Sequence, residues 1–149
     1  MSPRISIQHG DFDVAAEIEA LSRHANTGAV ATFTGLVRPE DGLTALTLEH
    51  YPNMTEREIA RHLAEAERRW PLLAATIIHR VGRLTPGERI VFVGVASSHR
   101  AASFEACQFL MDYLKTRAPF WKEEERGQAK SWVEAKASDD SAAERWREK

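Results

Sequence analysis

The segment at residues 28–37 (GAVATFTGLV) constrains the fold more than any other part of the chain. It is rich in β-forming residues, and a strand built from it would present apolar side chains on both faces. Strands of that kind are buried between layers of other elements, whereas a strand with one wet face alternates apolar and polar residues. The sequence therefore predicts that residues 28–37 form a central strand.

Six further segments have the alternation or β-rich composition of strands, and turn chemistry separates them. Residues 43–51 alternate, which predicts a strand with one solvated face, and Thr85-Pro86-Gly87 is a good turn between two of the others. Residues 38–42 (RPEDG) are expected to form a loop. The expected strands are residues 4–9, 43–51, 74–82, 88–97, 120–125 and 131–136.

Three helices are predicted from apolar spacing and from their end signals. The first follows Asp11 or Asp13 as its cap. The second begins at Asn53 with Glu56 in a capping-box arrangement and ends at Pro71. The third runs from about residue 99 to 118, because Pro119 disfavours helix in the residue before it. The expected buried stripes are Val14, Ile18, Leu21 and Ala25; Ile59, Leu63, Ala66 and Trp70; and Phe104, Cys107, Met111 and Leu114.

A final helix carrying Trp146 is expected to begin at Asp139 or Ser141. This order of elements predicts an α+β fold with a mostly antiparallel sheet and packed helices. With 149 residues and no linker or repeat, the chain is expected to form a single domain over residues 1–149.

Composition excludes several classes of protein. A net charge of −2 and a pI near 6.3 argue against a general nucleic-acid binder, which usually has a basic domain. The longest apolar run, residues 90–96, is too short to cross a membrane, and the first residues lack the apolar part of a secretory signal. A single cysteine allows no internal disulfide, so a cytoplasmic location is expected.

Basic side chains gather around the third helix. Between residues 99 and 122 four basic side chains stand against two acidic ones, a local charge of +2 in an acidic chain. His99 and Arg100 open the helix, where free backbone N–H groups and a guanidinium suit a phosphate or carboxylate. The alternative is a capping turn with a solvated arginine. The sequence thus indicates a site for a small anion.

Lys115 and Lys122 lie on either side of Pro119, so the chain reversal turns Lys122 away from the helical face. Phe120 and Trp121 would partly desolvate its ammonium group. The alternative is a pair of ordinary surface lysines. Arg100 and Lys115 are roughly 22 Å apart along a straight helix. If they share a site, a second copy of the chain must supply one of them, as a two-fold homodimer allows.

Arg38, Cys107 and the single histidines each have a simpler interpretation. Arg38 ends the 28–37 strand at a loop, where functional side chains are common, although an ordinary surface arginine is the alternative. Cys107 lies on an apolar stripe and is expected to be a buried structural thiol. His50, His62 and His79 occur singly without ligand spacing, so no metal site is expected.

Eight segments of the chain, in order, closely resemble the catalytic (large) subunit family of molybdopterin synthase. The longest of them combines the end of the third helix with the Pro119 reversal. The segments are TFTGLVR (32–38), LTLEHYP (46–52), IHRVG (78–82), PGE (86–88), VFVGV (91–95), SHR (98–100), MDYLKTRAPFWKE (111–123) and WVEA (132–135).

The resemblance implies a fold, a reaction and two kinds of partner. The fold would be the α/β-hammerhead, and the reaction would transfer two sulfurs to cyclic pyranopterin monophosphate, forming the dithiolene of molybdopterin in molybdenum cofactor biosynthesis. The sulfur would come from the C-terminal Gly-Gly thiocarboxylate of a small ubiquitin-like subunit. Two large subunits would form a homodimer within a heterotetramer. No cofactor, metal, nucleic acid or membrane is implied.

The resemblance also assigns site residues. Lys115 and Lys122 would be catalytic. Lys115 would stabilise the charge that develops during sulfur transfer, Lys122 would anchor the tail or the phosphate, and His99 could move a proton. The substrate-binding set would be Leu36, Val37, Arg38, His99, Arg100, Lys115, Lys122, Glu123 and Glu124.

Two departures from the family pattern stand out. The 38–42 loop is shorter than is common, and residues 123–126 (EEER) are more acidic than expected, which bears on Glu123 and Glu124. The alternative function, from another class, is a noncatalytic scaffold that binds a ubiquitin-like Gly-Gly tail.

Overall fold

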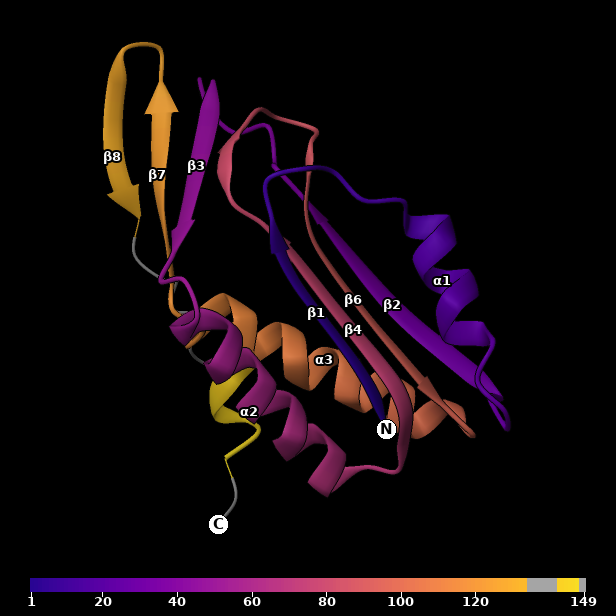
Figure 1. The fold of residues 1–149 in the computed structure, drawn as a ribbon. Coiled ribbons are helices and arrows are strands. Elements are labelled where there is room, and N and C mark those ends of the chain that lie inside the picture. The colour runs from indigo at the N-terminus through magenta and orange to yellow at the C-terminus, as the bar shows by residue number, and fades with distance from the viewer. Residues whose placement is uncertain (134–141, 148–149) are drawn as a thin grey trace.

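The part of the chain that the structure describes forms two four-stranded sheets, and helices pack on one of them (Figure 1). The structure is a computed structural model, and it describes residues 1–133 and 142–147. The expected α+β class with mostly antiparallel sheets is confirmed.

The first sheet has the order β1-β4-β6-β2. Its strands are β1 (Ser2–Gln8), β4 (Leu72–Arg80), β6 (Arg89–Ser97) and β2 (Ala29–Leu36). β1 is parallel to β4, and the other pairs are antiparallel. β4 and β6 are buried along almost their whole length, which fits their apolar sequences.

The prediction of a central position for residues 28–37 is wrong. β2 is a strand as expected, but it pairs with β6 alone and forms an edge of the sheet. Its apolar Phe33 and Leu36 are 41% and 55% exposed. The pattern revealed two apolar faces, but it carried no information about whether both edges are paired.

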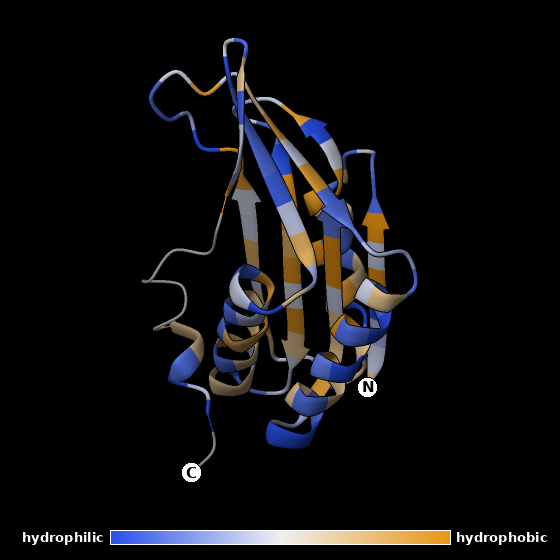
Figure 2. Ribbon diagram, turned by 90° about the vertical axis from the view of Figure 1, so that its left-hand side faces the viewer, coloured by the Kyte–Doolittle hydropathy of each residue, from blue (hydrophilic) through white to orange (hydrophobic). Residues whose placement is uncertain are grey.

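Helices cover both faces of this sheet (Figures 1 and 2). α1 (Val14–Ser22) packs on one face, and α2 (Met54–Arg69) and α3 (Arg100–Thr116) pack on the other. Both predicted caps are present. Ala16 N–H donates to the Asp13 carboxylate at 3.1 Å, and Asn53 N–H donates to Glu56 Oε1 at 3.0 Å. These caps satisfy N–H groups that would otherwise lack partners.

Two details of the predicted helix stripes are wrong. Phe104 was expected on the buried side of α3, but it is 65% exposed, and Phe109, Leu110 and Tyr113 are buried instead. The buried face of α3 is wider than one stripe because the sheet, α2 and Trp146 all contact it. Ala25 lies beyond the end of α1.

The second sheet has the order β5-β3-β7-β8, with all pairs antiparallel. Its strands are β5 (Gly82–Leu84), β3 (Ala45–His50), β7 (Phe120–Arg126) and β8 (Ala129–Val133). The three-residue β5 was not predicted. β3, β7 and β8 stand at one end of the first sheet, next to the end of α3 (Figure 1).

Some predictions fall on residues outside the described part. Residues 134–136 of the last predicted strand, and Asp139 and Ser141 as helix starts, lie there. Residues 142–144 are helical, and the Trp146 ring meets Trp70 and Phe109 edge-on at 5.9 and 5.6 Å. No helix within the described residues is long and apolar enough to cross a membrane.

Candidate active site

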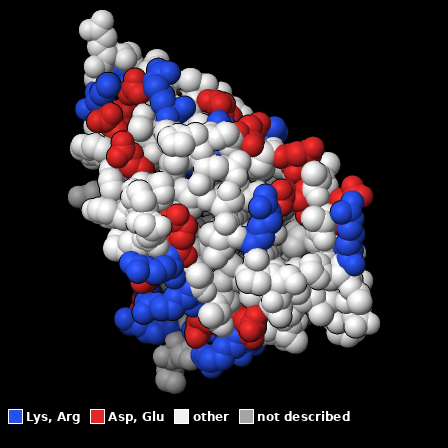
Figure 3. Space-filling view, in the orientation of Figure 1, with Lys and Arg blue, Asp and Glu red and all other residues white. Residues whose placement is uncertain are grey.

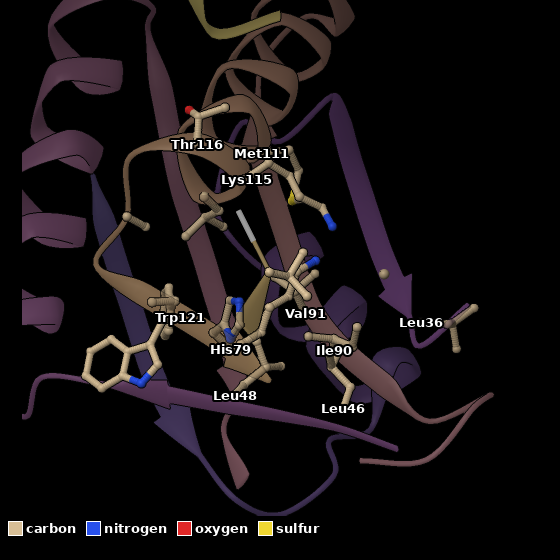
Figure 4. Close-up of a pocket in the computed structure, with 16 residues that line it drawn as sticks. Leu36, Leu46, Leu48, His79, Ile90, Val91, Met111, Lys115, Thr116 and Trp121 are labelled. Atoms are coloured by element: carbon tan, nitrogen blue, oxygen red, sulfur yellow. The ribbon is translucent and has the colours of Figure 1, made fainter. Parts of the chain in front are cut away.

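A cavity of about 230 Å³ lies where the end of α3 and the second sheet meet the first sheet (Figure 4). Most of its lining side chains are apolar, and two are lysines. The lining residues are Gly35, Leu36, Leu46, Leu48, His79, Ile90, Val91, Met111, Leu114, Lys115, Thr116, Ala118, Phe120, Trp121, Lys122 and Val133. They come from six strands, one helix and the turn after it, so only the folded chain creates this space.

The chain reversal at Pro119 brings Lys115 and Lys122 to the same cavity. The N–H of Ala118 donates to Tyr113 O at 3.1 Å, which closes the end of α3. The Thr55 hydroxyl donates to Pro119 O at 3.0 Å and fixes the turn to α2. β7 then pairs with β3, with Lys122 opposite Leu48. The sequence prediction that the reversal reorients Lys122 agrees with this geometry.

The two lysines differ in their exposure. Lys115 is on the last turn of α3 and is exposed, so it stands at the mouth of the cavity. Lys122 is half-buried within β7 and shares a face of the sheet with Leu48 and Val133. The ammonium groups of Lys115 and Lys122 lie beside apolar cavity walls. Such low-dielectric surroundings strengthen the attraction between an ammonium group and an anion.

His79 is a cavity residue that the sequence interpretation missed. Its Nδ1 lies 2.9 Å from Arg80 O, and its ring stacks on Phe120 with centroids 3.9 Å apart. Burial, with smaller effects of Lys115 and His50, lowers the pKa of His79 to about 4. The imidazole is therefore neutral near pH 7. No local pattern in the sequence indicated this role, because its neighbours come from β3, α3 and β7.

Arg38, His99 and Arg100 do not line the cavity. His99 is the N-cap of α3, and Arg100 begins the helix, so both lie at the end opposite Lys115. Both side chains are exposed. The expected separation of Arg100 and Lys115 is thus present in the chain. Arg38 is in the loop after β2, 74% exposed and 3.9 Å from Glu40.

The remaining predicted residues have mixed positions. Leu36 lines the cavity and is exposed, whereas Val37 is buried in a cluster with Leu46, Leu48 and Leu84. Glu124 forms an ion pair with Arg126 at 3.2 Å. Glu123 pairs with Thr47 and directly follows Lys122 in β7. Its side chain therefore belongs to the other face of the second sheet.

The comparison with known proteins decides the family. The model of the MoaE protein family matches residues 7–117, about three quarters of the chain. The "Molybdopterin synthase catalytic subunit" of Mesorhizobium japonicum is 58% identical over 151 aligned positions, covering 99% of this chain and 95% of the relative. This chain belongs to the MoaE family.

Solved structures of other proteins share the fold. The "Molybdopterin cofactor biosynthesis protein E" of Burkholderia multivorans has a TM-score of 0.84 and 47% identity, covering 98% of this chain and 97% of that one. A complex of subunits 1 and 2 of the molybdopterin-converting factor of Helicobacter pylori matches at a TM-score of 0.75 and 20% identity, covering 87% and 89%. The hammerhead fold expected from the resemblance is confirmed by these matches.

The single cysteine of this MoaE-family chain is buried. Burial raises the pKa of Cys107 to about 11, and its thiol points to Val93 O at 3.7 Å. The thiol is a packed group, as predicted. Within the described residues, no group of three or more His, Cys, Asp or Glu side chains could hold a metal ion.

The surface charge of the molecule is mixed. On the face drawn in Figure 3, Lys and Arg side chains alternate with Asp and Glu. That face does not form the continuous basic surface that binds long nucleic acids. The two cationic side chains of the candidate site, Lys115 and Lys122, belong to the cavity lining.

Proposed function

We propose that this chain is the catalytic subunit of a molybdopterin synthase. It transfers two sulfurs to cyclic pyranopterin monophosphate and so forms the dithiolene of molybdopterin. The observation that carries the proposal is the convergence of Lys115 and Lys122 on one narrow, largely apolar cavity. Membership of the MoaE family and relatives named as catalytic subunits support the same reaction.

The sulfur donor in this proposal is a small ubiquitin-like subunit with a Gly-Gly thiocarboxylate at its C-terminus. A glycine tail is thin enough to enter a cavity of about 230 Å³, which is below the roughly 300–1,000 Å³ of ordinary ligand pockets. The Helicobacter pylori structure, a complex of two subunits, is consistent with such a partner. The pterin then sits at the mouth, beside Lys115 and Leu36.

The lysines supply electrostatic stabilisation. Attack of the thiocarboxylate sulfur on a pterin side-chain carbon forms a C–S bond and breaks the bond from that carbon to the cyclic phosphate, which opens to a monoester. The two molecules are then linked through an acyl–sulfur bond. Water then adds to the acyl carbon, and the resulting tetrahedral oxyanion is stabilised by the Lys115 ammonium. Its collapse breaks the acyl–sulfur bond, leaves the sulfur on the pterin and releases the tail as a carboxylate. A second tail repeats the transfer at the neighbouring carbon, where the displaced oxygen leaves as water. Lys122, deeper in the cavity, holds the tail or the substrate phosphate.

A second copy completes the site in this proposal. His99 and Arg100 of the second copy add a helix N-terminus and a guanidinium for the phosphate, because Arg100 cannot reach Lys115 within one chain. The exposed Phe33 on edge strand β2 and the exposed Phe104 on neighbouring α3 offer apolar surface for that copy. Burying them would also explain why β2 is apolar on both faces.

The other substrate-binding residues follow from the same arrangement. Leu36 contacts the pterin at the mouth, and Val37 supports the loop that carries Arg38 to the phosphate. His99 moves a proton during the transfer. We place Glu123 and Glu124 at the margin of the site. The chain, with its single buried cysteine, acts in the cytoplasm and as one domain.

Reconstitution tests this function directly. The chain is mixed with the thiocarboxylated small subunit and cyclic pyranopterin monophosphate, and dithiolene is measured as it forms. The catalytic subunit yields product, whereas a scaffold that only binds the tail yields none. Lys115→Ala is expected to lose about 10²–10³ in rate with its fold intact. Lys130→Ala, an exposed lysine on β8, is the matched control and should keep the full rate.

A further inference from the structure

His79 holds a hydrogen-bond acceptor that the described chain does not use. A carbonyl oxygen only accepts, so the 2.9 Å contact with Arg80 O requires that Nδ1 carries the proton. In the neutral ring, Nε2 is then an acceptor. No hydrogen bond between described residues involves Nε2. Every fully buried side-chain N or O atom among the described residues has a hydrogen-bond partner, so Nε2, which has none, is not fully buried. Nε2 is therefore open to the cavity.

Rotating the His79 ring away from the cavity would cost favourable contacts. His79 is only 7% exposed, and its ring is stacked on Phe120 at an interplanar angle of 15°. Rotation would break the bond to Arg80 O and the stacking together. The imidazole thus presents a fixed acceptor in the wall of a cavity whose other lining side chains are mostly apolar (Figure 4).

An acceptor in that position matches one feature of a peptide tail. Each residue of an extended chain carries a backbone N–H, and an N–H group buried without a partner costs about 1–3 kcal/mol. Lys115, Lys122 and Trp121 offer only donors to the cavity. The side-chain oxygen or nitrogen acceptors of the lining are His79 Nε2 and Thr116 Oγ1, and Thr116 lies near the mouth beside Lys115.

We propose that His79 Nε2 accepts a hydrogen bond from a backbone N–H in the glycine tail of the sulfur-donating subunit. This inference rests on the proposed function, because it takes the tail as the occupant of the cavity. His79 then fixes the depth to which the tail enters and so places its terminal carbonyl and sulfur relative to Lys115. It is a binding and positioning residue, which neither the sequence pattern nor the names of the relatives assign.

The first test compares variants for binding of the small subunit in its stable carboxylate form. His79→Phe keeps an aromatic ring against Phe120 but removes the acceptor, so the Kd is expected to rise on the order of tenfold. His79→Gln returns an acceptor near Nε2 and should recover most of the loss. His62→Phe is the matched control, because His62 is also stacked between aromatic rings but does not line the cavity.

A second measurement separates the tail from the rest of the interface. With a small subunit that lacks its last two residues, wild type and His79→Phe should bind equally, because the proposed donor is gone. An undiminished effect of His79→Phe on the truncated partner would mean that the substitution only disturbs the structure, and would overturn the inference. Equal binding of the intact tail by wild type and His79→Phe would overturn it too.

Steady-state kinetics show whether the hydrogen-bond donor to His79 Nε2 comes from the tail or from the pterin. They also separate failure of this inference from failure of the proposed function. His79→Phe is expected to raise KM for the thiocarboxylated subunit and to leave KM for the pterin unchanged. A change in the pterin KM alone would contradict the inference. If wild type forms dithiolene while His79→Phe binds the tail normally, only the His79 inference fails. If wild type forms none, the proposed function itself fails.

Discussion

His62 and His79 are two neutral imidazoles with different surroundings. Each is stacked on aromatic rings, and burial is the largest cause that lowers the pKa of each to about 4. His62 packs between α2 and α3, whereas His79 faces the cavity. His79 differs from His62 in facing the cavity and in its hydrogen bond to Arg80 O.

Stability should depend on pH through His79. In the unfolded chain its imidazole binds a proton near pH 6.5, but in the folded chain only near pH 4. The free energy of unfolding therefore falls as the pH drops from 6.5 to 4, by up to about 3 kcal/mol, of which about 2 kcal/mol is lost by pH 5. The free energy of unfolding of His79→Phe, measured by urea denaturation, should decrease between pH 7 and pH 5 by about 2 kcal/mol less than that of the wild type. Equal decreases for both proteins would contradict the assignment.

Cys107 should be dispensable for the reaction. Its thiol is buried and its raised pKa keeps it protonated at neutral pH, and in the proposed function the sulfur comes from the partner. Cys107→Ala is expected to cost about 1 kcal/mol of stability through lost packing and to form dithiolene at the wild-type rate. The measurement is product formation by the folded variant. A large loss of turnover would show that the chain's own sulfur takes part.

At the scale of elements, β6 connects the two sides of the molecule. Its residues face α1 on one side of the sheet and α3 on the other, and Gly94 permits the close approach of α1. A Cβ atom at Gly94 would lie 2.4 Å from Leu21 Cδ1 and 2.9 Å from the Phe92 ring. Both of those side chains are fully buried and have little room to move.

Gly94→Ala is therefore expected to destabilise the fold by about 1–3 kcal/mol through overpacking. Gly10→Ala is the matched control, because a Cβ atom there meets nothing within 4 Å. Its effect should stay within about 0.5 kcal/mol. Urea denaturation of the two variants measures the difference, and equal stability would show that α1 does not pack on β6 as described.

The sequence predicted most elements because their signals are local. Asp13, Asn53 and Pro119 mark helix ends through hydrogen bonds or ring geometry that involve only near neighbours. The edge position of β2 and the short β5 were not predictable, because pairing partners far away in the sequence decide both. The exposed Phe104 was mispredicted for the same reason.

The candidate site divides in the same way. The turn of Lys122 away from the helical face was predictable, because Pro119 indicates a chain reversal between it and Lys115, and both lysines line the cavity. His79 was missed because it reaches the cavity from β4 and meets Phe120, which lies about forty residues further along the chain. Its sequence context shows only an apolar strand that contains a histidine.

At the scale of the whole molecule, the basic side chains of the proposed site lie in two separate places. Lys115 and Lys122 share the cavity, while His99 and Arg100 lie at the far end of α3. A rigid helix holds them apart, so one chain cannot bring all four to a small phosphorylated substrate. Two copies related by a two-fold axis can do so, with each site built from both chains.

The most direct test of this account mixes two inactive variants, Arg100→Ala and Lys115→Ala, and measures dithiolene formation after the subunits exchange. Each mixed dimer has one site with both substitutions and one site with neither. With random exchange in an equimolar mixture, about a quarter of the wild-type activity should return. Activity that stays at the level of the separate variants would contradict a site shared between two copies.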